Sequence, residues 1–407
     1  MDGSIIICTE SGHIFIRTRT SRGNVSKTSK FQRVPYMQRV TNVCANIAGA
    51  FGALRMDFKP KSITMTGNTL TQDLAELQPY LQIAPFSLTH ATLDCRMEFS
   101  PGPLPFFGDD EDEDTSVRND MFCIRRLYSF LLQRDTFHGT RLPHGADLIL
   151  QLPSGLSIPV HRVILATRAP VFCDVLSGVQ GIQNQDATIS IRLIHVKRSP
   201  ATLTPIYIAC TGCHAVSILL LLTYLYSDEI PALWDRLVSS AFHQESKALG
   251  VDPIQIKVEL QALAQVLKLP LLSRALESPA KRSPALSLVA DMARLFDLAQ
   301  NQTPGNFPAT INGFGKTPLH PDVILQLSDK DILCHSFILR ARSPFFASFF
   351  DDEDWTVNRW DADGTIKIDM RHMDERIIHF VLRFLYGDEE LFVTLGMFFL
   401  FEQEVHG

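Results

Sequence analysis

Two stretches of this chain nearly repeat each other, and the repeat limits the fold more than any other feature. The first reads ADLILQLPSGLSIPVHRVILATRAPVF from Ala146, and the second reads PDVILQLSDKDILCHSFILRARSPFF from Pro321. In both copies, alternating apolar residues predict a strand, a turn follows, and a second strand ends at a histidine. A helical pattern then runs to a proline, Pro170 or Pro344, at the same distance from that histidine. Proline disfavours helical geometry in the residue before it but fits the first turn of a helix, so a second helix is expected after each break.

Both copies are followed, further along the chain, by an apolar helical segment that ends in a similar tag. The tags read YLYSDE, over Tyr224–Glu229, and FLYGDE, over Phe384–Glu389. The order of the repeated elements predicts two homologous domains, each with the order strand, strand, helix, helix, strand, helix, and therefore an α+β fold. The first copy carries a longer loop, between Gly178 and Cys210.

The N-terminal segment has β character. SIIICTE and HIFIRTR flank a tight turn at Ser11-Gly12 and predict a hairpin, and the later stretches VTNVCANIAGAFGALR and SITMTGN also resemble short strands. A linker is expected over Phe99–Ser116, because it combines Pro and Gly with six consecutive acids, Asp109 to Asp114. Like charges repel and stay solvated, so this run predicts a disordered tether.

Helices are expected on either side of the first copy. Met121–Asp135 has apolar residues at helical spacing. Asp252-Pro253 predicts a helix start, and Pro270 is expected to end that helix. Ser283-Pro284 predicts the start of another. These boundaries divide the chain into a β segment (1–98), an acidic linker (99–120), a first domain with flanking helices (121–280), a helix and linker (281–317) and a second domain (318–407).

Composition excludes several function classes. The chain has 407 residues and a net charge of −6, so it lacks the basic surplus of a nucleic-acid-binding protein. Its 8 cysteines are thinly spread and no signal peptide is evident, which predicts reduced thiols in an intracellular protein, cytoplasmic or nuclear. The longest apolar run, Ala215–Tyr226, is too short to span a bilayer and predicts a buried helix, so no membrane partner is expected.

The repeated unit resembles the BTB/POZ domain. Members of that family show a strand beginning Asp-Val or Asp-Leu, a strand ending in His, a helix of the type H-R-x-x-L-x-x-R-S-P-x-F, and a later helix ending L-Y-x-D/G-E. The copies depart from this pattern at Ala169, for Ser, and at Ser336, for Arg. The matching residues are Asp147, His161, Arg162, Leu165, Arg168, Pro170, Phe172, Leu225, Tyr226 and Glu229 in the first copy, and Asp322, His335, Leu339, Arg342, Ser343, Pro344, Phe346, Leu385, Tyr386 and Glu389 in the second.

The N-terminal segment resembles the end of a regulator-of-chromosome-condensation propeller repeat. This order, a blade followed by tandem BTB domains, is similar to proteins of the Bruton tyrosine kinase inhibitor type. Such proteins carry ankyrin repeats and a full propeller ahead of two BTB domains. Because one blade cannot bury both of its faces, we expect this chain to be a truncated piece of a longer protein. The second domain also ends soon after its tag, which predicts truncation there as well.

The BTB/POZ resemblance implies protein binding without bond chemistry, so no enzyme activity and no cofactor or metal are expected. Many BTB domains dimerise, and a subset dock on cullin-3 as substrate adaptors of ubiquitin ligases, so the expected partners are cullin-3, a substrate protein and another BTB domain. In that family, docking involves an apolar residue two positions before an acid, and the second copy offers Phe350 before Asp352. The expected protein-binding residues are Phe349, Phe350, Asp352, Tyr386 and Tyr226. The first copy lacks this pattern.

Other interpretations remain open at this point. A regulatory scaffold or kinase-binding inhibitor would use the same domains without a cullin. His161 and His335 are expected to be structural, because no nucleophile is paired with them, and Arg168 and Arg342 are expected to suit helix C-terminal ends. CTGCH, from Cys210, matches half a zinc site, a haem-attachment pattern or a redox thiol pair. GFGKTP, over residues 313–318, lacks the first glycine of a phosphate-binding loop, so we reject that motif.

Overall fold

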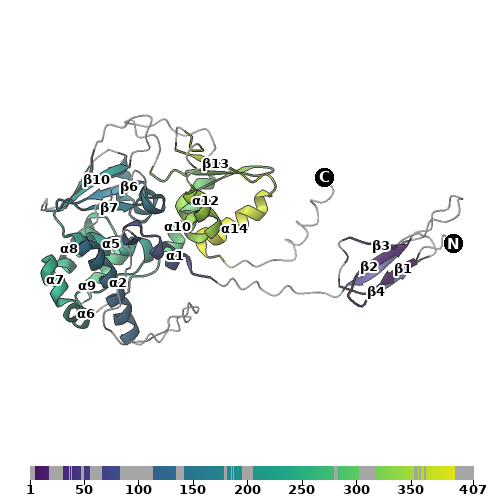
Figure 1. Cartoon of the computed structure of the whole chain (residues 1–407), viewed down its shortest axis with the longest axis horizontal. Coiled ribbons are helices and arrows are strands. Elements are labelled where there is room, and N and C mark those ends of the chain that lie inside the picture. Colours follow the sequence, from purple (N-terminus) through teal and green to yellow (C-terminus); the bar gives the residue numbers. More distant parts are fainter. Residues whose placement is uncertain are drawn as a thin grey trace. The chain divides into compact units, whose positions relative to one another are not determined.

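The computed structural model of the chain shows a mixed α+β protein (Figure 1). It divides into two units, one holding residues 1–65 with 390–407 and one holding residues 66–389. The residues that the structure describes are 5–17, 31–55, 67–82, 113–133, 142–177, 181–194, 205–278, 283–301 and 318–389, apart from short gaps at 36, 38, 47–49, 185, 187, 353–355, 357–358 and 362–363.

The N-terminal unit contains short antiparallel strands, as the sequence predicts. Strands β1 (Ile5–Cys8) and β2 (Ile14–Arg17) form the expected hairpin, and β3 (Gln32–Arg33) adds to its edge. Gly12 in the turn has a φ of 75°, a conformation that glycine adopts without strain. A second hairpin joins β4 (Val40–Ala45) to β5 (Phe51–Arg55). The SITMTGN stretch lies outside the described residues except for its last two, and membership of these strands in a propeller stays a prediction.

The first repeated stretch and its tag form a compact module, residues 146–229, which we call the first module. Strand β6 (Leu148–Gln151) pairs antiparallel with β7 (Ser157–Val160) and parallel with β10 (Ile206–Thr211). The longer loop of this copy supplies two extra strands at the sheet edge, β8 (Ile182–Gln183) and β9 (Ser190–Ile194). The sheet order is therefore β7-β6-β10-β9-β8.

The second repeated stretch and its tag, residues 321–389, form the second module with the same core topology. Strand β11 (Val323–Gln326) pairs antiparallel with β12 (Asp331–Cys334) and parallel with β13 (Ile366–Asp369). The order β12-β11-β13 corresponds to β7-β6-β10. A hairpin followed by a parallel third strand is thus common to both modules, and the parallel strand is reached through helices in each case.

The helices of the two modules also correspond. Each hairpin leads into a short helix, a proline break and a second helix, and each parallel strand leads into a longer helix. This longer helix is buried almost throughout in the first module and along one face in the second. The helices are α3 (Arg162–Arg168), α4 (Val171–Leu176) and α5 (Ala215–Ser227) in the first module, and α11 (Ser336–Arg342), α12 (Pro344–Asp351) and α14 (Glu375–Gly387) in the second.

Further helices surround the first module, and some of them differ from expectation. α2 begins at Glu113, inside the expected linker. Pro270 ends one helix but also begins the next, and the helix expected at Ser283 starts at Leu288. These elements are α1 (Leu70–Glu76), α2 (Glu113–Gln133), α6 (Arg236–Ala241), α7 (His243–Leu249), α8 (Pro253–Val266), α9 (Pro270–Glu277) and α10 (Leu288–Gln300), with 3-10 turns η1 (Pro79–Gln82) and η2 (Pro143–Gly145).

The helix α8 illustrates why these segments fold as they do. Asp252 caps the helix by accepting a hydrogen bond from the backbone N–H of Ile254 at 3.0 Å, and Pro253 occupies the first position, as the sequence predicts. An apolar stripe of α8 is buried where the helix packs against the first module, and the side chain of Gln255 lies beside Glu259. The buried stripe consists of Ile256, Leu260, Leu263 and Leu267.

The first module has a core of its own, and the core of the second module, which we call the shared core, also includes residues of the first. Val163, Ile164 and Tyr226 of the first module are buried in the same cluster as the strands and helices of the second. The ring of His161 lies 5.7 Å from the ring of Phe337 in the second module, measured between centroids. Because residues of both modules are buried in this cluster, the modules pack against each other within residues 66–389.

Candidate protein-interaction site

Each module contains a buried histidine that hydrogen-bonds to the tyrosine of its tag. Nδ1 of His161 lies 2.8 Å from the Tyr226 hydroxyl, and Nδ1 of His335 lies 3.0 Å from the Tyr386 hydroxyl. The other ring nitrogen of each histidine contacts a backbone carbonyl. Burial lowers the pKa of both histidines from 6.5 to about 4, so both rings are neutral at pH 7. The histidines are structural, as expected, and both tyrosines are fully buried.

An arginine and an aspartate of the first module anchor helix α10. Arg168, the last residue of α3, forms a buried ion pair with Asp228, which follows α5. The other oxygen of Asp228 accepts the backbone N–H of Leu288, the first residue of α10, at 2.7 Å. Asp291, one turn into α10, also pairs with Arg168. The carboxylate of Asp228 therefore ties the arginine and the α10 N-terminus together.

The second module holds helix α1 in the same way. Arg342, the last residue of α11, pairs with Asp388, which follows α14. The other oxygen of Asp388 accepts the backbone N–H of Leu70, the first residue of α1, at 2.7 Å. Asp73, one turn into α1, lies 2.6 Å from Arg342. We refer to Arg168 with Asp228, and Arg342 with Asp388, as the two anchoring pairs.

Helices α1 and α10 are equivalent elements that the repeat analysis missed. The residues LTQDLAEL, from Leu70, and LVADMARL, from Leu288, share the pattern L-x-x-D-L/M-A-x-L. Their leucines and methionine are buried at matching positions, and their aspartates pair with matching arginines. Thr69 and Gln72 also form a capping box, which could have identified α1 from sequence. The aspartates that both tags share, Asp228 and Asp388, were a second sequence signal of these contacts.

The two equivalent helices are exchanged between the modules. α1 precedes the first module in the chain but is anchored by the second, and it contacts both α5 and α11. α10 precedes the second module but is anchored by the first, and it contacts both α14 and α3. Each contact therefore has a counterpart, so the two modules pair through two similar sets of interactions.

The predicted binding residues near the end of α12 lie in different environments. Phe350 is 4% exposed, and the guanidinium of Arg340 stacks 5.4 Å from its ring centroid. Phe349 is partly exposed and Asp352 is exposed. Phe345, which the sequence analysis did not select, is 65% exposed and stacks on Phe349 with 6.3 Å between ring centroids. Phe345, Phe349 and Asp352 thus form an accessible aromatic and acidic surface, which we call the α12 surface.

The corresponding helix of the first module has no such surface. Counted from the proline that both copies share, Val171 of α4 corresponds to Phe345 of α12, and Leu176 corresponds to Phe350. Leu176 is buried like Phe350, but Val171 is half-buried and small. The accessible aromatic pair is therefore a feature of the second module.

The CTGCH motif has a structural explanation. Gly212 has a φ of 85°, and a Cβ there would lie 1.6 Å from the backbone oxygen of Thr188, so glycine is needed for the turn into α5. His214 caps α5 by accepting the backbone N–H of Val216 at 3.2 Å. Burial raises the pKa of Cys210, and raises the pKa of Cys213 to about 12, which disfavours the reactive thiolate.

The GFGKTP stretch lies outside the described residues except for its final proline. Among the residues that the structure describes, no group of three or more His, Cys, Asp or Glu side chains is arranged to hold a metal ion. Within that same part of the chain, every helix is too short or too polar to cross a membrane.

Comparison with known proteins places the second module in a family. Residues 312–394 match the BTB/POZ domain, so a BTB/POZ domain is present. The chain is also similar to "BTB/POZ domain-containing protein 1" of Schizosaccharomyces pombe (strain 972 / ATCC 24843), with 25% identity over 399 residues. The similarity covers 95% of this chain and 26% of that protein, so the chain spans about a quarter of its relative's length.

The BTB/POZ domain supports a role for this chain in protein interaction, because domains of this family bind other proteins and generally carry no enzymatic site. The family match falls on the second module. The assignment of the first module to the same family, the propeller repeat and the likeness to Bruton tyrosine kinase inhibitors stay predictions.

Proposed function

We propose that this chain is a non-enzymatic adaptor with tandem BTB/POZ domains. In this proposal the first module is a BTB/POZ domain, as the second module is. The proposal is supported by the shared strand pairing, the buried His–Tyr pairs and the two anchoring pairs, all at equivalent positions. Such an adaptor acts inside the cell, in the cytoplasm or nucleus, and needs no cofactor.

The two domains pair with each other within one chain. The exchanged helices and the shared core occupy the faces that join the modules. A homodimer through these same faces would require both modules to separate first. We therefore propose intramolecular pairing as the state in which this chain meets its partners, in place of a homodimer through that interface.

The α12 surface is proposed to dock cullin-3, which would make the chain a substrate adaptor of a ubiquitin ligase. The observation that carries this proposal is the exposure of Phe345, an aromatic side chain in position to enter an apolar groove beside the acid Asp352. Because Val171 replaces the aromatic residue in the first module, we expect one cullin-3 for each chain. Phe350 is buried and packs against Phe349 of this surface.

The N-terminal strands are proposed to contact the substrate protein as part of a propeller-type repeat. Several of their apolar side chains are exposed, including Ile5 on β1 and Leu54 on β5. Exposed apolar residues on isolated strands are typical of a sheet that packs against further repeats or a partner.

Binding of purified cullin-3 N-terminal domain, measured by calorimetry, tests the docking proposal. Phe345→Ala with Phe349→Ala should weaken binding by at least about tenfold, since buried aromatic anchors contribute about 2 kcal/mol or more. Asp352→Ala should weaken it less. Val171→Ala is the matched control and should leave affinity unchanged.

Two results would redirect the proposal. If the folded native chain does not bind cullin-3, a regulatory scaffold or kinase-binding inhibitor becomes the better function. If the native chain and the double variant bind equally well, cullin-3 uses another surface. Thermal unfolding of each variant separates lost binding from lost structure, which matters most for a variant at the buried Phe350.

A further inference from the structure

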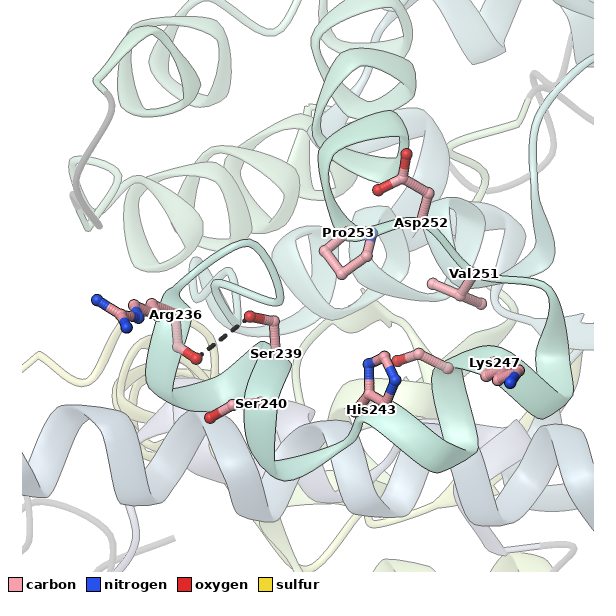
Figure 2. A pocket seen from close by; sticks show the side chains of 9 residues that line it. Arg236, Ser239, Ser240, His243, Lys247, Val251, Asp252 and Pro253 are labelled. Carbon is pink, nitrogen blue, oxygen red and sulfur yellow. Dashed lines mark hydrogen bonds between the residues drawn. The ribbon is translucent and has the colours of Figure 1, made fainter.

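A groove lined by both polar and apolar residues lies on the helices that follow the first module. None of its residues belongs to the α12 surface. It has a volume of about 490 Å³ and runs between α6 and α7 on one side and the start of α8 on the other. Figure 2 shows Arg236 at one end, Lys247 toward the other, and His243 between them, facing Pro253. The groove is thus bordered by basic side chains along its length.

The basic groups of the groove have no acidic partners. Arg236, His243 and Lys247 are exposed, and none forms an ion pair among the described residues. Asp252 is the one carboxylate that lines the groove, and it is engaged in capping α8. The whole chain has a net charge of −6, so this groove is a local exception that favours an anionic ligand.

The serines of the groove are suited to a polypeptide. The hydroxyl of Ser239 donates to the carbonyl of Arg236 at 3.3 Å, and that of Ser240 donates to the carbonyl of Leu237 at 2.9 Å. Because both hydroxyl protons are donated to these carbonyls, the serine oxygens can act toward a ligand only as hydrogen-bond acceptors. They can receive backbone N–H groups, whereas the carboxylates of a ligand are left to the basic side chains.

Two exposed apolar residues directly follow lining residues of the groove in the chain. Leu237, next to Arg236, is 60% exposed, and Ile254, next to Pro253, is 72% exposed. Large apolar side chains at such exposure add contact area for an apolar residue of a ligand. A ligand that combines carboxylates with an apolar side chain matches this surface better than a small inorganic anion does.

We propose that this groove binds an extended acidic segment of a partner protein, with carboxylates at Arg236 and Lys247 and an apolar residue against Leu237 or Ile254. The inference goes beyond the docking of cullin-3, because it concerns a different surface and a different partner chemistry. It gives the adaptor a second contact, on the helices that follow the first module. Binding of this kind is favoured by charge complementarity and weakens as salt rises.

Fluorescence anisotropy of a labelled acidic peptide with one central leucine tests the proposal on the full chain. The native chain should bind it saturably, and Arg236→Gln with Lys247→Gln should weaken binding about tenfold, since each exposed ion pair contributes a few-fold. Arg371→Gln with Arg376→Gln removes the same charge from the second module and should leave binding unchanged. All four side chains are exposed, so the folds should survive.

Three outcomes would overturn the proposal. The native chain could fail to bind the peptide, or both double variants could lose binding equally, which would indicate general charge attraction. The third outcome involves the chain's own acidic run. If the peptide binds only after Asp109–Asp114 are changed to Asn and Gln, that run is the occupant and no partner is needed.

Discussion

Arg168 and Asp228 lie 60 residues apart in the chain and form an ion pair whose side chains are only 2% and 1% exposed. Arg342 and Asp388 form the equivalent ion pair in the second module, where the aspartate side chain is 25% exposed. In each case the aspartate follows the long helix with a positive φ, 60° or 48°, and so directs its carboxylate at another helix. The anchoring pairs therefore connect the end of one module to the start of a helix outside it.

Breaking the first anchoring pair should destabilise the protein strongly. Arg168→Met leaves the Asp228 carboxylate buried without its cation, which costs about 3–5 kcal/mol. We expect this loss in the free energy of unfolding, measured with urea at pH 7. Lys330→Ala, which removes an exposed ion pair, is the control and should change stability by less than about 0.5 kcal/mol. Similar losses in both variants would mean that the pair is not a structural anchor.

Helix α1 should stabilise the second module, which anchors it, although in the chain it comes before the first module. Leu74 is fully buried in the shared core, so Leu74→Ala should cost about 2–5 kcal/mol. Hydrogen exchange should show faster opening of β11 and α11 in the second module. Leu237→Ala, at an exposed leucine, should leave exchange unchanged. If protection were lost only near the first module, the exchanged arrangement would be incorrect.

Stability should fall as the pH drops below about 6.5. Both His161 and His335 have a folded-state pKa near 4, below the value of 6.5 expected when unfolded, because burial disfavours the charged ring. The unfolded chain then binds more protons between pH 6.5 and 4, so stability is full above 6.5 and decreases toward 4. Each histidine can contribute at most about 3 kcal/mol of this loss.

Urea unfolding at pH 7.5, 6 and 5 measures this dependence. His161→Gln with His335→Gln should lower stability at pH 7.5 and flatten its decrease between pH 6 and 5. The exposed His243→Gln should leave the pH profile of the native chain in place. An unchanged slope in the buried double variant would assign the pH dependence to other groups.

The full chain should be monomeric if its modules pair internally. Light scattering after size-exclusion chromatography should give a mass near 45.7 kDa at micromolar concentration. Arg342→Met, which loosens the anchoring of α1, should increase self-association, since the freed module faces can then pair between chains. A stable dimer of the native chain would show that intramolecular pairing does not replace the homodimer.

The cysteines of the CTGCH motif should be unreactive in the folded protein. Burial raises the pKa of Cys210 and Cys213, whereas Cys44 is exposed on β4. A thiol-specific disulfide reagent at pH 8 should therefore modify Cys44 quickly and the other two only after unfolding. Mass spectrometry of peptides after a short exposure distinguishes the sites. Rapid joint modification of Cys210 and Cys213 would restore the redox interpretation.

The repeat made the strands and helices of both modules predictable, because each carries strong periodicity that ends at a proline or a tag. The N-terminal hairpin and the start of α8 were predictable from turn and capping residues. The roles of Arg168 and Arg342 were not, since their partners come from helices distant in sequence. Spacing also placed Phe350 at the binding site, but only packing against Arg340 reveals that it is buried, while Phe345 is exposed.

The exchange of helices affects how this chain folds while it is being synthesised. The backbone N–H of Leu70 finds its acceptor on Asp388, 318 residues later. At ribosomal rates of about 5–20 residues per second, α1 emerges tens of seconds before the carboxylate that anchors it. During that interval its leucines have no final binding site, so nascent chains should depend on chaperones until the last tag leaves the ribosome.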